Sequence, residues 1–102
     1  MENKINEVKE LYRKSLKVSD WQERGEIIKQ GFKVSVDIVK TVVPQERHYI
    51  VDQVVEALLN NRGLGWFCDN REGLMIRVID KKEIAKYAAN WVTKAKETGL
   101  QI

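Results

Sequence analysis

The stretch PQERHYIVDQVVEALLNNRGLGWFCDNREGLMIRVID, residues 44–80, decides the expected fold. Residues 45–60 carry apolar side chains at a 3.6-residue period, which predicts an amphipathic helix. Pro44 stands where a helix has no use for a backbone N–H, so it opens this helix. Gly63 can take the left-handed conformation that often ends a helix. The apolar stripe consists of Ile50, Val51, Val54, Val55, Leu58 and Leu59.

The second part of this stretch predicts a β-hairpin. Residues 64–68 and 74–79 are rich in aromatic and branched side chains, which are typical of strands. Between them, Asn70 and Gly73 occupy the first and last positions of a type I turn. Arg77 would then lie across the strands from Trp66 or Phe67, depending on the register.

The rest of the chain is expected to pack against this helix and hairpin. Ser19 and Gln22 form a capping box, which predicts a helix that Gly31 ends. Residues 32–36 alternate between apolar and polar, as in a strand. The expected elements are a helix over 3–17, a helix over 20–30, a strand over 32–36, a short helix over 37–43 and a last helix over 81–98.

A weak internal repeat offers an alternative for residues 20–34. Shifting the chain by about 45–47 residues brings Trp21 onto Trp66, as two copies of a helix–hairpin–helix unit would. In that arrangement residues 20–34 form a hairpin and not a capped helix. A groove between the two copies would suit a peptide.

Composition predicts one folded domain. The chain has 102 residues, 43% of them hydrophobic, and a single proline. We therefore expect one α+β domain spanning residues 1–102, with three to four amphipathic helices packed on a β-hairpin.

The chain is expected to be cytoplasmic and to have no membrane partner. Its one cysteine suits a reducing compartment. The first residues form a charged amphipathic pattern without the core of a signal peptide. No apolar run approaches the ~20 residues that cross a bilayer.

The sequence does not indicate an enzyme, a metal site or a cofactor. His48 and Cys68 are the single histidine and cysteine of the chain, and no residues have the spacing of zinc ligands. We expect His48 to flank a helix and Cys68 to be a small buried side chain. No carboxylate pair stands out, and the glycines do not form a phosphate-binding loop.

A protein-binding module is the function we expect, with a protein, a peptide or a second copy as partner. Aromatic residues and arginine are the types that concentrate at interface hot spots. The expected contact surface is one face of the hairpin together with an aromatic residue on the polar face of helix 45–60. The residues are Trp66, Phe67, Arg71, Arg77 and Tyr49.

The alternative is a winged-helix-like protein that binds nucleic acid. Residues 36–60 would then form two helices and residues 64–79 the wing. The contact residues would be Arg13, Lys14, Lys17 and Arg71. The outer face of helix 45–60 speaks against this helix entering a groove, because it carries three acids and no base.

Overall fold

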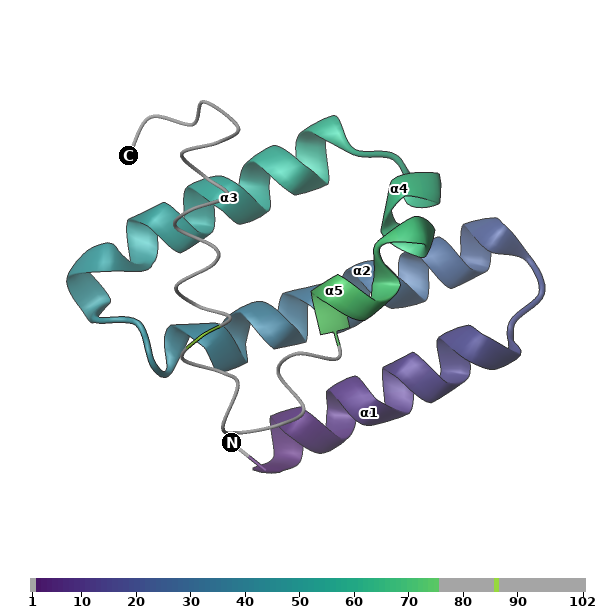
Figure 1. Ribbon diagram of the computed structural model, residues 1–102, viewed down its shortest axis with the longest axis horizontal. Coiled ribbons are helices and arrows are strands. Elements are labelled where there is room, and N and C mark those ends of the chain that lie inside the picture. Colours follow the sequence, from purple (N-terminus) through teal and green to yellow (C-terminus); the bar gives the residue numbers. More distant parts are fainter. Residues whose placement is uncertain (1, 76–85, 87–102) are drawn as a thin grey trace.

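The structure is a computed structural model that describes residues 2–75 and 86 of the 102. Its helices are α1 (Glu2–Lys17), α2 (Trp21–Lys40), the 3-10 helix η1 (Gln45–Arg47), α3 (His48–Asn61), α4 (Leu64–Asp69) and α5 (Arg71–Met75). Figure 1 shows α2 between α1 and α3. The short helices α4 and α5, which follow the α3–α4 loop, also pack on α2. Since α2 contacts each of the other α-helices, it is the centre of the fold.

Several predicted helices are confirmed. Residues 3–17 lie in α1, and residues 45–60 lie in η1 and α3. The helix predicted over residues 20–30 is also present, and it begins after Asp20, whose side chain accepts a hydrogen bond from the Glu23 backbone N–H at 3.3 Å. The cap is thus one residue later than the Ser19 box predicted. Gly63 has an extended backbone, with φ −84°, and does not use the left-handed region.

The strand predicted over residues 32–36 is wrong, because α2 continues through Gly31 to Lys40. Phe32, Val36 and Val39 are buried at helical spacing. The alternation of apolar and polar residues in this short stretch therefore arose by chance in a helix that is buried on two sides. The predicted helix over 37–43 is the end of α2 and the turn after it. The hairpin alternative for residues 20–34, on which the internal repeat depended, is wrong for the same reason.

The hairpin predicted over residues 64–79 is wrong for the part that is described. Residues 64–75 form two short helices, and Asn70 joins them: its backbone N–H donates to the Trp66 carbonyl at 3.0 Å, and its own carbonyl accepts from the Leu74 N–H at 3.1 Å. A hairpin with apolar residues on both faces would need cover on both sides. Two short helices leave less apolar surface to be covered, because Phe67, Leu74 and Met75 turn inwards. The exposed residues of this segment are Gly65, Asp69, Asn70, Glu72 and Gly73.

The fold class is therefore all-helical and the expected α+β class is wrong. No strand occurs among residues 2–75 and 86. The rest of the predicted second strand, with Arg77, lies outside the described residues. So does the predicted helix 81–98, apart from Lys86. None of the described helices is long and apolar enough to cross a membrane.

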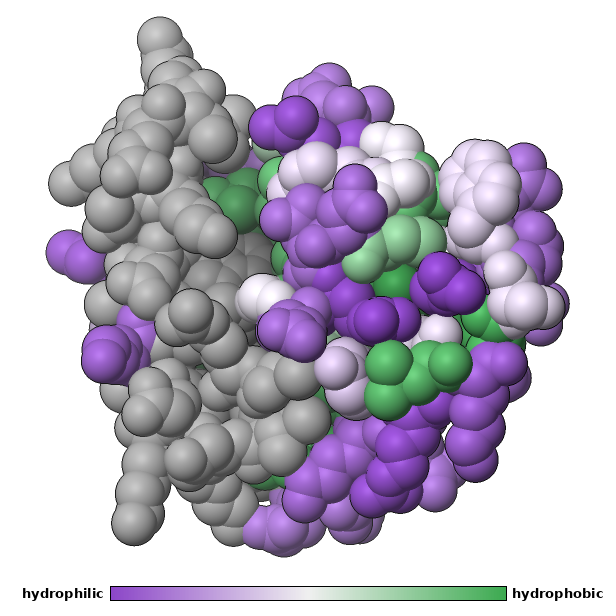
Figure 2. Space-filling model, turned by 45° about the vertical axis from the view of Figure 1, so that its right-hand side comes forward, coloured by the Kyte–Doolittle hydropathy of each residue, from purple (hydrophilic) through white to green (hydrophobic). Residues whose placement is uncertain are grey.

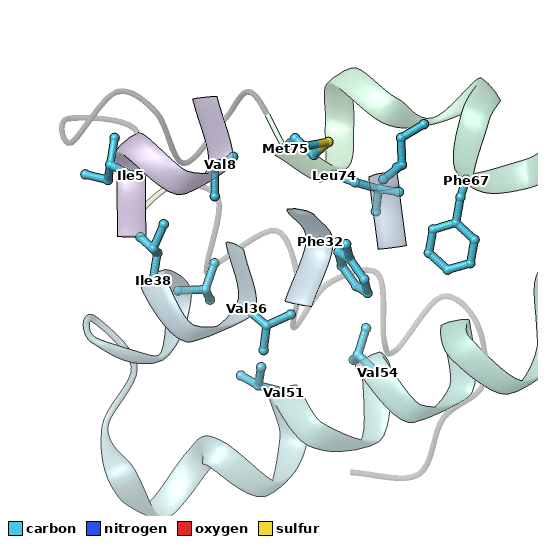
Figure 3. Packing of buried hydrophobic residues seen from close by; sticks show 12 residues of the cluster. Ile5, Val8, Phe32, Val36, Ile38, Val51, Val54, Phe67, Leu74 and Met75 are labelled. Atoms are coloured by element: carbon cyan, nitrogen blue, oxygen red, sulfur yellow. The ribbon is translucent and has the colours of Figure 1, made fainter. Parts of the chain in front are cut away.

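The core lies where four helices meet around α2. Figure 3 shows Phe32 and Val36 of α2 between Val51 and Val54 of α3 on one side and the α5 side chains on the other. The Phe32 and Phe67 rings are tilted, with centroids 6.0 Å apart, and both side chains are fully buried. The largest fully buried side chains are Phe32, Phe67, Ile28, Ile38, Met75, Val8, Val39 and Val51.

Arg24 fastens the turn between α1 and α2. Its guanidinium donates two hydrogen bonds to the Val18 carbonyl, from Nε at 3.2 Å and from Nη2 at 2.8 Å. That carbonyl lies just beyond the end of α1, where helical carbonyls lack partners. The side chain is partly buried, so water replaces these bonds incompletely.

We expect Arg24→Ala to lower the free energy of unfolding by about 1–2 kcal/mol, because the carbonyl loses a charged donor. Arg24→Lys should recover only part of this loss, since an ammonium lacks the two-pronged geometry of a guanidinium. Denaturant unfolding measures both, with the exposed Glu26→Ala on the same helix as the control. An effect of Arg24→Ala no larger than that of Glu26→Ala would contradict this role.

Candidate protein-binding surfaces

Trp66, Phe67 and Arg71, the described contact residues of the predicted hairpin, do not share an exposed face. Phe67 is fully buried on α4, so its side chain is not available to a partner in this structure. Trp66 is partly buried, edge-on to Phe67 at 5.2 Å between centroids, and the Arg62 guanidinium lies 5.3 Å from its ring centre. Binding of a partner at these residues stays a prediction.

Arg71, predicted for both functions, belongs to the packing of α5 on α1. Its guanidinium lies 5.6 Å from the centre of the Tyr12 ring, a cation–π contact between the two helices. Its Nε is buried and has no hydrogen-bond partner in the described part of the chain. The side chain is only partly exposed, so a partner could contact less of Arg71 than of a fully exposed arginine.

Tyr49 lies on the solvent-facing side of α3, as predicted, and is 53% exposed. The apolar stripe of this helix turns towards α2, with Val51 and Val54 buried. The opposite side presents an acidic ridge, which consists of Tyr49, Asp52, Gln53 and Glu56, all exposed. Asp52 also accepts a salt bridge at 2.5 Å from Lys40 of α2, which ties the two helices together.

The three cations predicted on the first helix do lie together. Arg13, Lys14 and Lys17 are exposed on the last two turns of α1, and with Glu10 they line a shallow, open depression. We call these four residues the basic ridge. At 100° per residue they span the side of α1 opposite Ile5, Val8 and Tyr12, which face the core and α5.

Two exposed apolar side chains near the basic ridge were not predicted. Leu16, in the last turn of α1, is 54% exposed. Trp21, which begins α2, is 53% exposed, and its carbonyl accepts a hydrogen bond from the Cys68 thiol at 3.5 Å. Both flank the α1–α2 turn.

The same end of the molecule comes forward in Figure 2. The coloured residues there are mainly hydrophilic, with small hydrophobic areas between them. Among the described residues, the large hydrophobic side chains that are exposed are Leu16, Trp21, Val42 and Tyr49. Leu16 and Trp21 flank the α1–α2 turn, whereas Val42 and Tyr49 lie on the α2–α3 side.

The single histidine has a structural position. The Nε2 atom of His48 lies 3.0 Å from the Lys40 carbonyl and 2.9 Å from the Val43 carbonyl. Because both partners only accept, Nε2 must carry a proton and donate. His48 thereby holds the α2–α3 turn. Cys68 is partly buried, and no group of three or more metal-ligating side chains occurs in the described part of the chain.

Over residues 2–75 these features define a small all-helical domain, in which α1 carries a basic ridge and α3 an acidic one. No known protein family, curated protein or solved structure matches the chain.

Proposed function

We propose that this chain is a protein-binding module whose contact surface lies along the second half of α1 and at the α1–α2 turn. The observation that carries the proposal is the exposure of Leu16 and Trp21, at 54% and 53%, beside the basic ridge. Single exposed apolar side chains are ordinary, but a leucine and a tryptophan at one turn expose apolar surface that a partner would remove from water. Tryptophan and arginine are also the residues most enriched at interface hot spots.

The chemistry of the surface indicates the partner. The basic ridge has three cations and one acid, so an acidic segment would find complementary charge there. Leu16 lies one helical turn after Arg13 and next to Lys17, where an apolar side chain of the partner would meet it. We therefore infer an acidic segment that also carries apolar side chains.

Nucleic acid fits this surface less well. The wing of the alternative is replaced by helices over residues 64–75, and α3 carries two acids and no lysine or arginine. On this surface phosphate contacts would depend on the three cations of the basic ridge, and affinity for duplex DNA grows with the number of such contacts.

The test is a titration of the isotope-labelled whole chain with an amphipathic peptide that has glutamates and leucines one helical turn apart. We expect the amide resonances of Leu16, Lys17 and Trp21 to shift. Trp21→Ser should weaken binding about five- to thirty-fold, as loss of a contact of about 1–2 kcal/mol does. Val42→Ser, an exposed apolar residue away from this end, is the matched control and should leave the affinity unchanged.

Two results would overturn the proposal. One is that the peptide leaves these resonances unmoved. The other is that a short DNA duplex binds the chain more tightly than the peptide does, with an affinity that falls steeply as salt is raised.

A further inference from the structure

The acidic ridge and the basic ridge have the same spacing. The basic ridge occupies positions 10, 13, 14 and 17, and the acidic ridge occupies positions 49, 52, 53 and 56. Each therefore covers two turns of helix and about 10.5 Å. All eight side chains are exposed. The two ridges carry opposite net charge, which makes them complementary in both length and sign.

The two ridges cannot meet within one chain. α1 and α3 lie on opposite sides of α2, as Figure 1 shows, and each ridge is on the side of its helix opposite the core. A contact between an acidic and a basic ridge would thus have to join two molecules.

We propose that the partner of the basic ridge is a second copy of this chain, which docks through its acidic ridge. This inference rests on the proposed function and names its partner. The exposed Tyr49 gives the acidic ridge an aromatic side chain two helical turns from Glu56, and the exposed Leu16 lies beside Lys17 of the basic ridge. The partner that the basic ridge requires, an acidic segment with apolar character, is present on the chain itself.

Charge selects a parallel alignment of the two helices. In a parallel alignment Lys17 is level with Glu56, and the turn that carries Arg13 and Lys14 is level with the turn that carries Asp52. Glu10 is then level with Tyr49, whose hydroxyl can donate to a carboxylate. An antiparallel alignment would place Glu10 level with Glu56, where two like charges repel.

Glu56 is the acid on which this contact depends most. The other acid, Asp52, already pairs with Lys40 of its own chain. Lys17 is the residue of the basic ridge that lies level with Glu56. Such exposed pairs contribute little one at a time and weaken as salt is raised, so we expect a weak association that salt reverses.

The contact is heterologous, because two different surfaces of the same molecule meet. After pairing, one copy keeps a free acidic ridge and the other keeps a free basic ridge, so further copies can add at both ends. Growth then continues as an open chain unless the rotation between copies closes a ring. The average mass should therefore keep rising with concentration beyond that of a dimer.

The test measures the mass of the whole chain in solution by light scattering or sedimentation over a range of concentrations. At low salt we expect the mass to rise with concentration, and at about 0.5 M salt to fall to that of the monomer. Glu56→Lys alone and Lys17→Glu alone should each reduce association about ten-fold or more, because each places like charges together. The matched controls are Glu26→Lys and Lys33→Glu on exposed positions of α2, which change the net charge equally and should leave association as it is.

Restoration gives the decisive result. A chain with both Lys17→Glu and Glu56→Lys exchanges the charges of the pair and should associate again. A mixture of the two single variants should also associate, since every junction between unlike variants matches. Failure of both restorations, or an equal loss in the α2 controls, would overturn the contact between the ridges.

A chain that stays monomeric at every concentration and salt would also overturn it. If the acidic peptide then still shifts Leu16 and Trp21, the module binds another protein and the proposed function stands. If the peptide is inert as well, both proposals fail.

Discussion

Replacing Phe32 by alanine is expected to lower the free energy of unfolding by about 3–5 kcal/mol, the range for emptying a fully buried aromatic site. Phe32 is 0% exposed at the centre of α2, and its ring packs against that of Phe67. A domain of this size is typically stable by about 5–15 kcal/mol, so this one change removes a large part of the margin. Denaturant midpoints of the two proteins measure it.

The neighbouring residue provides the control. Lys33 is exposed, and Lys33→Ala should change stability by no more than about 0.5 kcal/mol. Phe32→Leu should cost less than the alanine change, because it leaves a smaller cavity. Similar losses for Phe32→Ala and Lys33→Ala would mean that this part of α2 does not face the core.

Gly25→Ala is expected to destabilise the protein by about 1–3 kcal/mol, although alanine is the better helix former by about 1 kcal/mol. The reason is space. A Cβ at position 25 would lie 2.7 Å from the Leu64 Cβ and 3.2 Å from the Leu64 carbonyl oxygen, and neither atom is the free end of a flexible side chain. The beginning of α4 would have to move away from α2. Thermal or denaturant unfolding gives the sign.

Gly65→Ala is the matched change of opposite sign. Gly65 also lies within a helix, but a Cβ there would meet nothing within 4 Å. Helix propensity should then decide, with a gain of up to about 1 kcal/mol. Stabilisation by both alanines would show that α4 does not pack closely on α2.

Part of the candidate surface could be predicted from the sequence. The period of 3.6 residues in α1 and α3 placed the basic and acidic residues on the outer sides of these helices, where the structure has them. Such predictions succeed because a long helix with one apolar stripe has only one way to turn that stripe inwards. The exposure of Leu16 and Trp21 does not follow from the period, since it depends on which other helices pack against the α1–α2 turn.

The sequence by itself determined the long helices that have one apolar face, α1 and α3, and the beginning of α2 to within one residue. The tertiary structure alone decided that α2 continues through Gly31 to Lys40. A glycine in a sequence weakens a helix, but in the fold Gly25 and Gly31 let Leu64 and Met75 approach the α2 backbone. The tertiary structure also decided that residues 64–75 form two short helices. Their apolar side chains suit a strand or a helix equally, and packing against the core settles the choice because helices bury Phe67, Leu74 and Met75 while leaving the polar residues between them in water.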